Sequence, residues 1–111
     1  MVKARALKKR YVLFRLQGPD MEEHALKRAI YAEALKFFGE LGLSEAALKL
    51  VSYDHVKKTG ILRCERSYLE KVLGFLALVD SLNGSEARLI AIKSSGTIQG
   101  LEDVLESTHR R

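Results

Sequence analysis

Residues 60–84 read GILRCERSYLEKVLGFLALVDSLNG, and this stretch decides the fold because it joins a strand directly to a helix. Its first seven residues form a short, partly apolar run that is typical of a strand. Ser67 and Glu70 then have the spacing of a capping box, in which each side chain accepts a hydrogen bond from the other residue's amide. We therefore predict a helix that starts here and ends at Asn83-Gly84, a pair that favours a left-handed stop.

This predicted helix is apolar around more than half of its circumference. Beyond the stripe that a sheet would cover, the apolar arc includes Tyr68, Phe75, Leu78 and Leu82. We expect a second surface to cover these four residues, because a chain of this length cannot cover every helix on both sides. That surface is either the C-terminal segment of the same chain or a protein partner, and the second alternative makes the four residues a predicted partner interface.

Length and composition predict one globular domain. The chain has 111 residues, 47% of them hydrophobic, and no apolar run long enough to span a membrane. The basic N-terminus leads into a strand-like segment and not into the apolar stretch of a signal peptide. The single cysteine excludes an internal disulfide and a cysteine-based zinc site, which fits a reducing compartment. We expect a cytoplasmic protein.

The positive charge is concentrated at the N-terminus. The net charge is +5, and the first fifteen residues hold six of the 19 Lys and Arg residues but none of the 14 acidic residues. We interpret residues 1–8 as a basic arm and residues 9–111 as a single domain. Such an arm suits a phosphate backbone, because displaced counterions drive binding, although a solubilising tail would have the same charge.

The remaining elements follow from periodicity and turn residues. Alternating polarity predicts strands at 10–17, 47–53 and 87–93, and a turn at 54–59 predicts that the second strand pairs with residues 60–66 as a hairpin. A first helix begins at a second capping signature, Asp20 and Glu23, and ends at Gly42. After a turn at Ser94 to Thr97, a short helix is expected around Leu101, Val104 and Leu105.

The order strand, helix, strand, strand, helix, strand predicts an α+β fold of the ferredoxin-like type. Right-handed crossovers give a four-stranded antiparallel sheet with both main helices on one face, and the short C-terminal helix is an addition. RNA-recognition modules, small-molecule sensors and acylphosphatases share this βαββαβ architecture, so the fold alone does not decide the function.

No catalytic or metal-binding residues are expected. His24, His55 and His109 are too far apart in sequence for a paired metal motif, and Cys64 falls on the buried face of its strand. An acylphosphatase needs a cationic phosphate cradle after the first strand, where residues 17–20 read QGPD.

Single-stranded RNA binding needs aromatic residues on the open faces of the central strands. Tyr11 is one candidate, but the third strand places Ile61, Arg63 and Glu65 on that face, so the stacking platform is incomplete. A surface directed at the RNA backbone is the better interpretation. Its predicted residues are cations on the strands and hydroxyls at the last turn: Lys8, Lys9, Arg10, Arg15, Arg63, Arg66, Lys93, Ser95 and Thr97.

Three short motifs together resemble the archaeal ribonuclease P protein component 2 family. They are Lys9-Arg10-Tyr11, the run from Gly60 to Cys64, and the run from Ser95 to Ile98. The resemblance implies a ribonuclease P subunit that supports the catalytic domain of the RNA subunit, which removes the 5′ leader of precursor tRNA with Mg²⁺. It also implies a protein partner, component 3, and a homodimer of this chain within a heterotetramer. The other hypothesis is a ferredoxin-like interaction or sensing module that dimerises.

Overall fold

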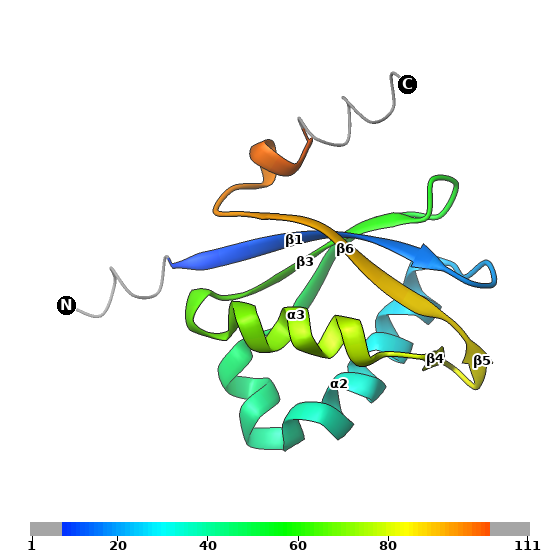
Figure 1. Cartoon of the computed structure of the whole chain (residues 1–111), viewed down its shortest axis with the longest axis horizontal. Coiled ribbons are helices and arrows are strands. Elements are labelled where there is room, and N and C mark those ends of the chain that lie inside the picture. The colour runs from blue at the N-terminus through cyan, green and yellow to red at the C-terminus, as the bar shows by residue number, and fades with distance from the viewer. Residues whose placement is uncertain (1–7, 103–111) are drawn as a thin grey trace.

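Four strands form one antiparallel sheet in the order β2-β3-β1-β6 (Figure 1). The computed structural model describes residues 8–102. The strands are β1 at Lys9–Gln17, β2 at Lys49–Asp54, β3 at Thr59–Glu65 and β6 at Arg88–Ser95. Each of the two crossovers runs through a helix and skips one strand, which is the ferredoxin-like arrangement that the sequence predicts.

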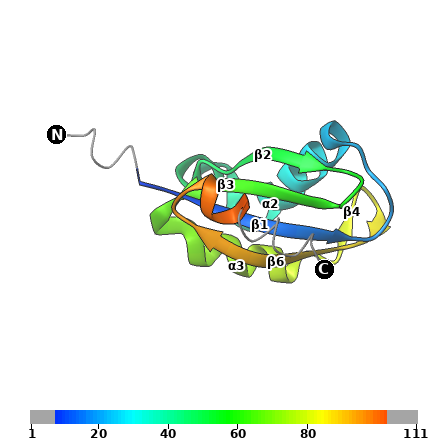
Figure 2. The ribbon, with the colours of Figure 1, turned by 90° about the horizontal axis from the view of Figure 1, so that it is seen from above.

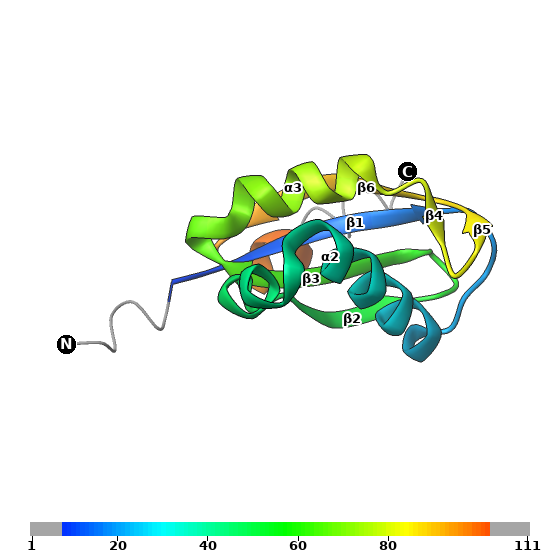
Figure 3. The same ribbon diagram turned by 90° about the horizontal axis from the view of Figure 1, so that it is seen from below.

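Both main helices lie on one face of the sheet (Figure 3). They are α2 at Glu23–Ala46 and α3 at Leu69–Leu78. Val12, Phe14 and Leu16 of β1 point towards them and are buried in the main core, because alternate residues of a strand face opposite sides. No helix within residues 8–102 is both long and apolar enough to cross a membrane.

The first helix begins and bends at other positions than predicted. The N-cap residue is Glu22 and makes no side-chain cap hydrogen bond, while Asp20 forms an ion pair of 3.3 Å with Lys58. Gly39 has φ 76° and ψ 171° and interrupts the helix before Gly42, the predicted end. Leu43 to Ala46, which the sequence placed between the end of this helix and the next strand, therefore belong to a second helical segment beyond the kink.

The second helix is shorter than predicted, and its capping box does not form. A 3₁₀ turn, η1 at Arg66–Tyr68, precedes α3, and no side chain caps either element. The helix ends at Leu78, and the chain continues as a hairpin of β4 at Ser81–Leu82 and β5 at Ser85–Glu86. Asn83 and Gly84 have φ 55° and 82°. Asn-Gly at positive φ is also the preferred hairpin turn, and here it makes that turn instead of a helix stop.

Candidate nucleic-acid interface

The C-terminal helix covers part of the sheet face that lies opposite α2 and α3. It begins at Ile98 after β6 and lies above β1 and β3 (Figures 1 and 2). Leu101 is fully buried there against Leu13 and Ile61, with Ile98 packed beside them. The predicted start of this helix is confirmed, whereas Val104 and Leu105 lie outside the described residues.

Most of the predicted RNA-binding residues lie at one end of the sheet. The N-terminal end of β1, the C-terminal ends of β3 and β6, and η1 meet at this end. Arg15 is the exception, because it pairs with Thr59 near the other end of β1. The residues that the fold brings to this end are Lys8, Lys9, Arg10, Arg63, Arg66, Lys93, Ser95 and Thr97. We call this region the basic end.

The cations of the basic end are held in different ways. Lys9 forms a 2.5 Å ion pair with Glu65, so its charge is offset within the chain. The Arg10 guanidinium donates to the Lys9 carbonyl oxygen at 3.0 Å. The Arg66 amide donates to the Lys8 carbonyl oxygen at 3.1 Å, which ties η1 to the start of β1. Lys8 and Arg66 are exposed and Arg10 is partly buried, so all three side chains are available to a polyanion.

The two hydroxyls at the turn after β6 act as structural caps. The Thr97 Oγ1 accepts from the Gly100 amide at 3.2 Å, which makes Thr97 the N-cap of the C-terminal helix. The Ser95 Oγ accepts from the Thr97 amide at 3.1 Å. A Cβ at Gly100 would lie 2.6 Å from the Ser95 Oγ, so the turn leaves no room for a larger residue.

Lys49 belongs to the basic end, but sequence reasoning missed it. A register shift between Leu50 and Ser52 places Lys49 opposite Arg63, on the open face. Continuing the regular pairing from Asp54 and Thr59 would instead point Lys49 towards the core. The feature that sequence reasoning missed is therefore a β-bulge. A bulge adds one residue to a strand, so the residues before it point to the opposite face from the one that regular alternation predicts.

Cys64 has no nucleophilic role that the geometry supports. It is fully buried in the main core on β3. Burial, with a smaller contribution from the charge of Glu65, raises the pKa of the thiol to about 11, so it remains a neutral core side chain. Within residues 8–102, no group of three or more His, Cys, Asp or Glu side chains is placed to hold a metal ion.

The predicted partner interface is not one continuous surface. Phe75 and Leu82 are buried in the main core, at 2% and 1% exposure, and Tyr68 packs against that core, whereas Leu78 is 67% exposed. Aromatic residues of α2 cover much of α3 instead, with Phe37 5.6 Å from Phe75 between ring centroids. The C-terminal segment does not cover α3 in the described residues, because Leu101 packs on the opposite sheet face.

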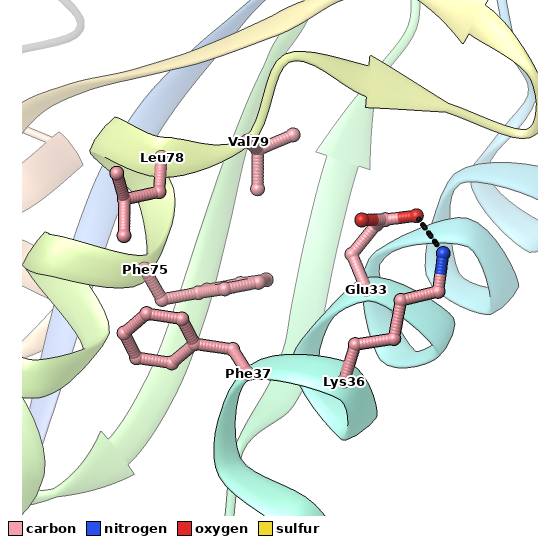
Figure 4. Close-up of a pocket in the computed structure, with 6 residues that line it drawn as sticks. All are labelled: Glu33, Lys36, Phe37, Phe75, Leu78 and Val79. Atoms are coloured by element: carbon pink, nitrogen blue, oxygen red, sulfur yellow. Dashed lines mark hydrogen bonds and ion pairs between the residues drawn. The ribbon is translucent and has the colours of Figure 1, made fainter.

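A small groove remains between α2 and α3 (Figure 4). It has a volume of about 250 Å³ and apolar walls from Phe37, Phe75, Leu78 and Val79. Glu33 and Lys36 form a 3.2 Å ion pair at its side. Leu78 is the one residue of the predicted interface that both lines this groove and is well exposed.

Comparison with known proteins identifies the family of this chain and agrees with its fold. The model of the Rpp14/Pop5 family matches residues 10–105. The chain belongs to this family. A curated protein of Pyrococcus furiosus named ribonuclease P protein component 2 is 35% identical over 96 residues, which cover 86% of this chain and 80% of that protein. The protein of the same name in Pyrococcus abyssi is 34% identical, with 86% of this chain and 81% of that protein covered.

A solved structure shows the same fold at low sequence identity. A chain in the cryo-EM structure of yeast ribonuclease MRP superposes with a TM-score of 0.67 at 11% identity, over 93% of this chain and 92% of that one. Membership of the Rpp14/Pop5 family explains why the three short motifs resemble a known family. Two of the motifs lie inside the matched region, and the first begins one residue before it.

Proposed function

We propose that this chain is a protein subunit of ribonuclease P that binds the enzyme's RNA through the basic end of the sheet. The single observation that carries the proposal is the convergence of cations from β1, β2, β3, β6 and η1 at one end, in a member of the Rpp14/Pop5 family. Cations gathered on one surface favour a polyanion because binding releases its counterions.

In this role the protein supports the catalytic domain of the RNA and does not supply the reacting groups. The RNA subunit removes the 5′ leader of precursor tRNA with Mg²⁺, and we propose that this chain lowers the Mg²⁺ requirement by neutralising phosphates in a cytoplasmic ribonucleoprotein. Exposed Lys8 and Arg66, together with Arg10, can act in this way without any catalytic residue.

We also propose a protein partner, ribonuclease P protein component 3, and a homodimer of this chain within a heterotetramer. The groove between α2 and α3 supports a protein contact, since Phe37 and Leu78 expose apolar surface beside it. Apolar side chains exposed at a groove are favourable contact points for a second protein.

Cleavage of precursor tRNA tests the proposal. The cognate ribonuclease P RNA is assayed at low Mg²⁺ with this chain and component 3, added singly and together. We expect cleavage to rise only when both proteins are present. No stimulation, with both proteins folded and the RNA active at high Mg²⁺, would contradict the subunit role.

A further inference from the structure

Four residues form a single row across the basic end on the open face of the sheet. Lys49 pairs with Arg63, Arg63 pairs with Tyr11, and Tyr11 pairs with Ser95. Residues directly opposite in antiparallel strands point to the same face, and neighbouring strands lie about 4.8 Å apart. The row therefore places an ammonium, a guanidinium, a phenol ring and a hydroxyl side by side.

The two central positions of the next row along the sheet are closed to ligands, while Lys93 of β6 in that row is exposed. These positions are Leu13 and Ile61, which are 1% and 6% exposed because Leu101 packs onto them. A nucleobase cannot stack on Leu13 and Ile61 without displacing the C-terminal helix. The C-terminal helix thus leaves the row of Tyr11 and Arg63 open for base stacking. Other proteins of this fold offer a longer stacking surface to single-stranded RNA.

The two central side chains of the row offer flat surfaces that are already positioned. Tyr11 is partly buried and packs against the cluster of Leu13, Ile61 and Leu101. Arg63 is partly buried as well, and its Nε is enclosed with no hydrogen-bond partner among residues 8–102. Partial burial limits the freedom of this guanidinium, so less side-chain entropy is lost when a base stacks on its plane.

We infer that this row binds one unpaired nucleotide of a structured RNA, with its base stacked on Tyr11 and Arg63. The inference rests on the proposed RNA-binding function and gives its recognition mode. Lys49 is exposed at one side of the row, and the Arg10 guanidinium lies at the turn on the other side, where a Cβ at Gly96 would come within 3.3 Å of it. These two cations take the flanking phosphates. Stacking requires only a π-face, so any of the four bases fits.

Two RNA hairpins of equal length and phosphate number test the inference. One is fully paired, and the other carries a single bulged 2-aminopurine, whose fluorescence reports stacking. The full chain is expected to bind the bulged hairpin about five-fold or more tightly, as a stacked base provides, and to change the fluorescence of the 2-aminopurine. Equal affinity for both hairpins with unchanged fluorescence overturns the inference but leaves RNA binding intact. Binding of neither hairpin at low salt overturns both.

Substitutions of Tyr11 and Arg63 test whether this row causes the preference for the bulged hairpin. Tyr11→Phe keeps the ring and should keep the preference, whereas Tyr11→Leu keeps apolar packing on Leu101 but removes the ring, and should equalise the two affinities. Arg63→Lys keeps the charge and removes the plane, so the preference should fall while the salt dependence stays. Melting temperatures show that each variant is folded. A preference that survives Tyr11→Leu and Arg63→Lys overturns the assignment.

Discussion

At the scale of single residues, Gly60 and Gly74 should respond in opposite ways to alanine. A Cβ at Gly60 would lie 2.8 Å from the Phe14 ring and 2.9 Å from the Ser52 carbonyl oxygen, so Gly60→Ala should cost about 1–3 kcal/mol through overpacking. Gly74 lies in α3, and within residues 8–102 nothing beyond its chain neighbours and the backbone of its own helix lies within 4 Å of such a Cβ, so Gly74→Ala should stabilise by about 0.5–1 kcal/mol. Urea unfolding measures the change in the free energy of unfolding for each variant. Two changes of the same sign would contradict the prediction.

Cys64 should make the stability depend on alkaline pH. Its folded pKa is raised from 9.0 to about 11, so the unfolded chain loses the thiol proton first. The stability contributed by the protonated thiol is therefore complete below pH 9 and is lost as the pH rises towards 11, by up to about 2–3 kcal/mol. Chemical unfolding of wild type and Cys64→Ala at pH 8 and pH 10.5 tests this. The difference between the two proteins cancels Lys and Tyr titrations, and a pH-independent difference would contradict the prediction.

Among the elements, helix α3 carries one apolar residue in the core, Phe75, and one at the surface, Leu78. Phe75 is 2% exposed and Leu78 is 67% exposed, although both belong to one predicted patch. Phe75→Asp should unfold the domain or cost several kcal/mol, because it buries a charge. Leu78→Asp should change stability by less than about 0.5 kcal/mol and weaken partner binding at the groove. Thermal melts and a pull-down with component 3 distinguish these effects, and an unfolded Leu78→Asp would be the contrary result.

The elements also show which parts of the structure were predictable. Alternation in β1 and the helical spacing of Leu26, Ile30 and Ala34 fix strand and helix types, and both were predicted. Turn residues were harder, since Asn83-Gly84 stops a helix or turns a hairpin with the same backbone preference. The choice depends on Leu82, which is buried in the core from β4, and that is a tertiary contact.

For the candidate site, the sequence predicted which face of the sheet some residues take but not how all of them are arranged. Charge concentration and alternation placed Arg63 and Tyr11 on one face, as the pairing of β1 with β3 confirms. Lys49 joined the site through the bulge in β2, and Arg15 lies apart from it near the other end of β1. The register shift lies between Leu50 and Ser52, and regular alternation counted from Asp54 does not include it.

At the scale of the whole molecule, the asymmetry of charge should control RNA affinity. Lys8, Arg10 and Arg66 lie at the basic end, and unlike Lys9 none of them forms an ion pair within the described residues. Replacing the three by Glu removes up to three phosphate contacts without breaking an internal pair. The slope of log affinity against log salt for ribonuclease P RNA should then become shallower by about 2–3, at roughly 0.7–0.9 for each contact.

A charge-matched control decides whether position or net charge is responsible. Arg28, Lys57 and Arg88 are exposed and lie on α2, in the turn after β2 and at the start of β6, away from the basic end. Their replacement by Glu changes the net charge by the same amount. Long-range repulsion is screened beyond about 8 Å at physiological salt, so this control should keep most of the wild-type slope. If both triple variants lose the same slope, the protein's overall charge governs binding and the basic end is not the RNA surface.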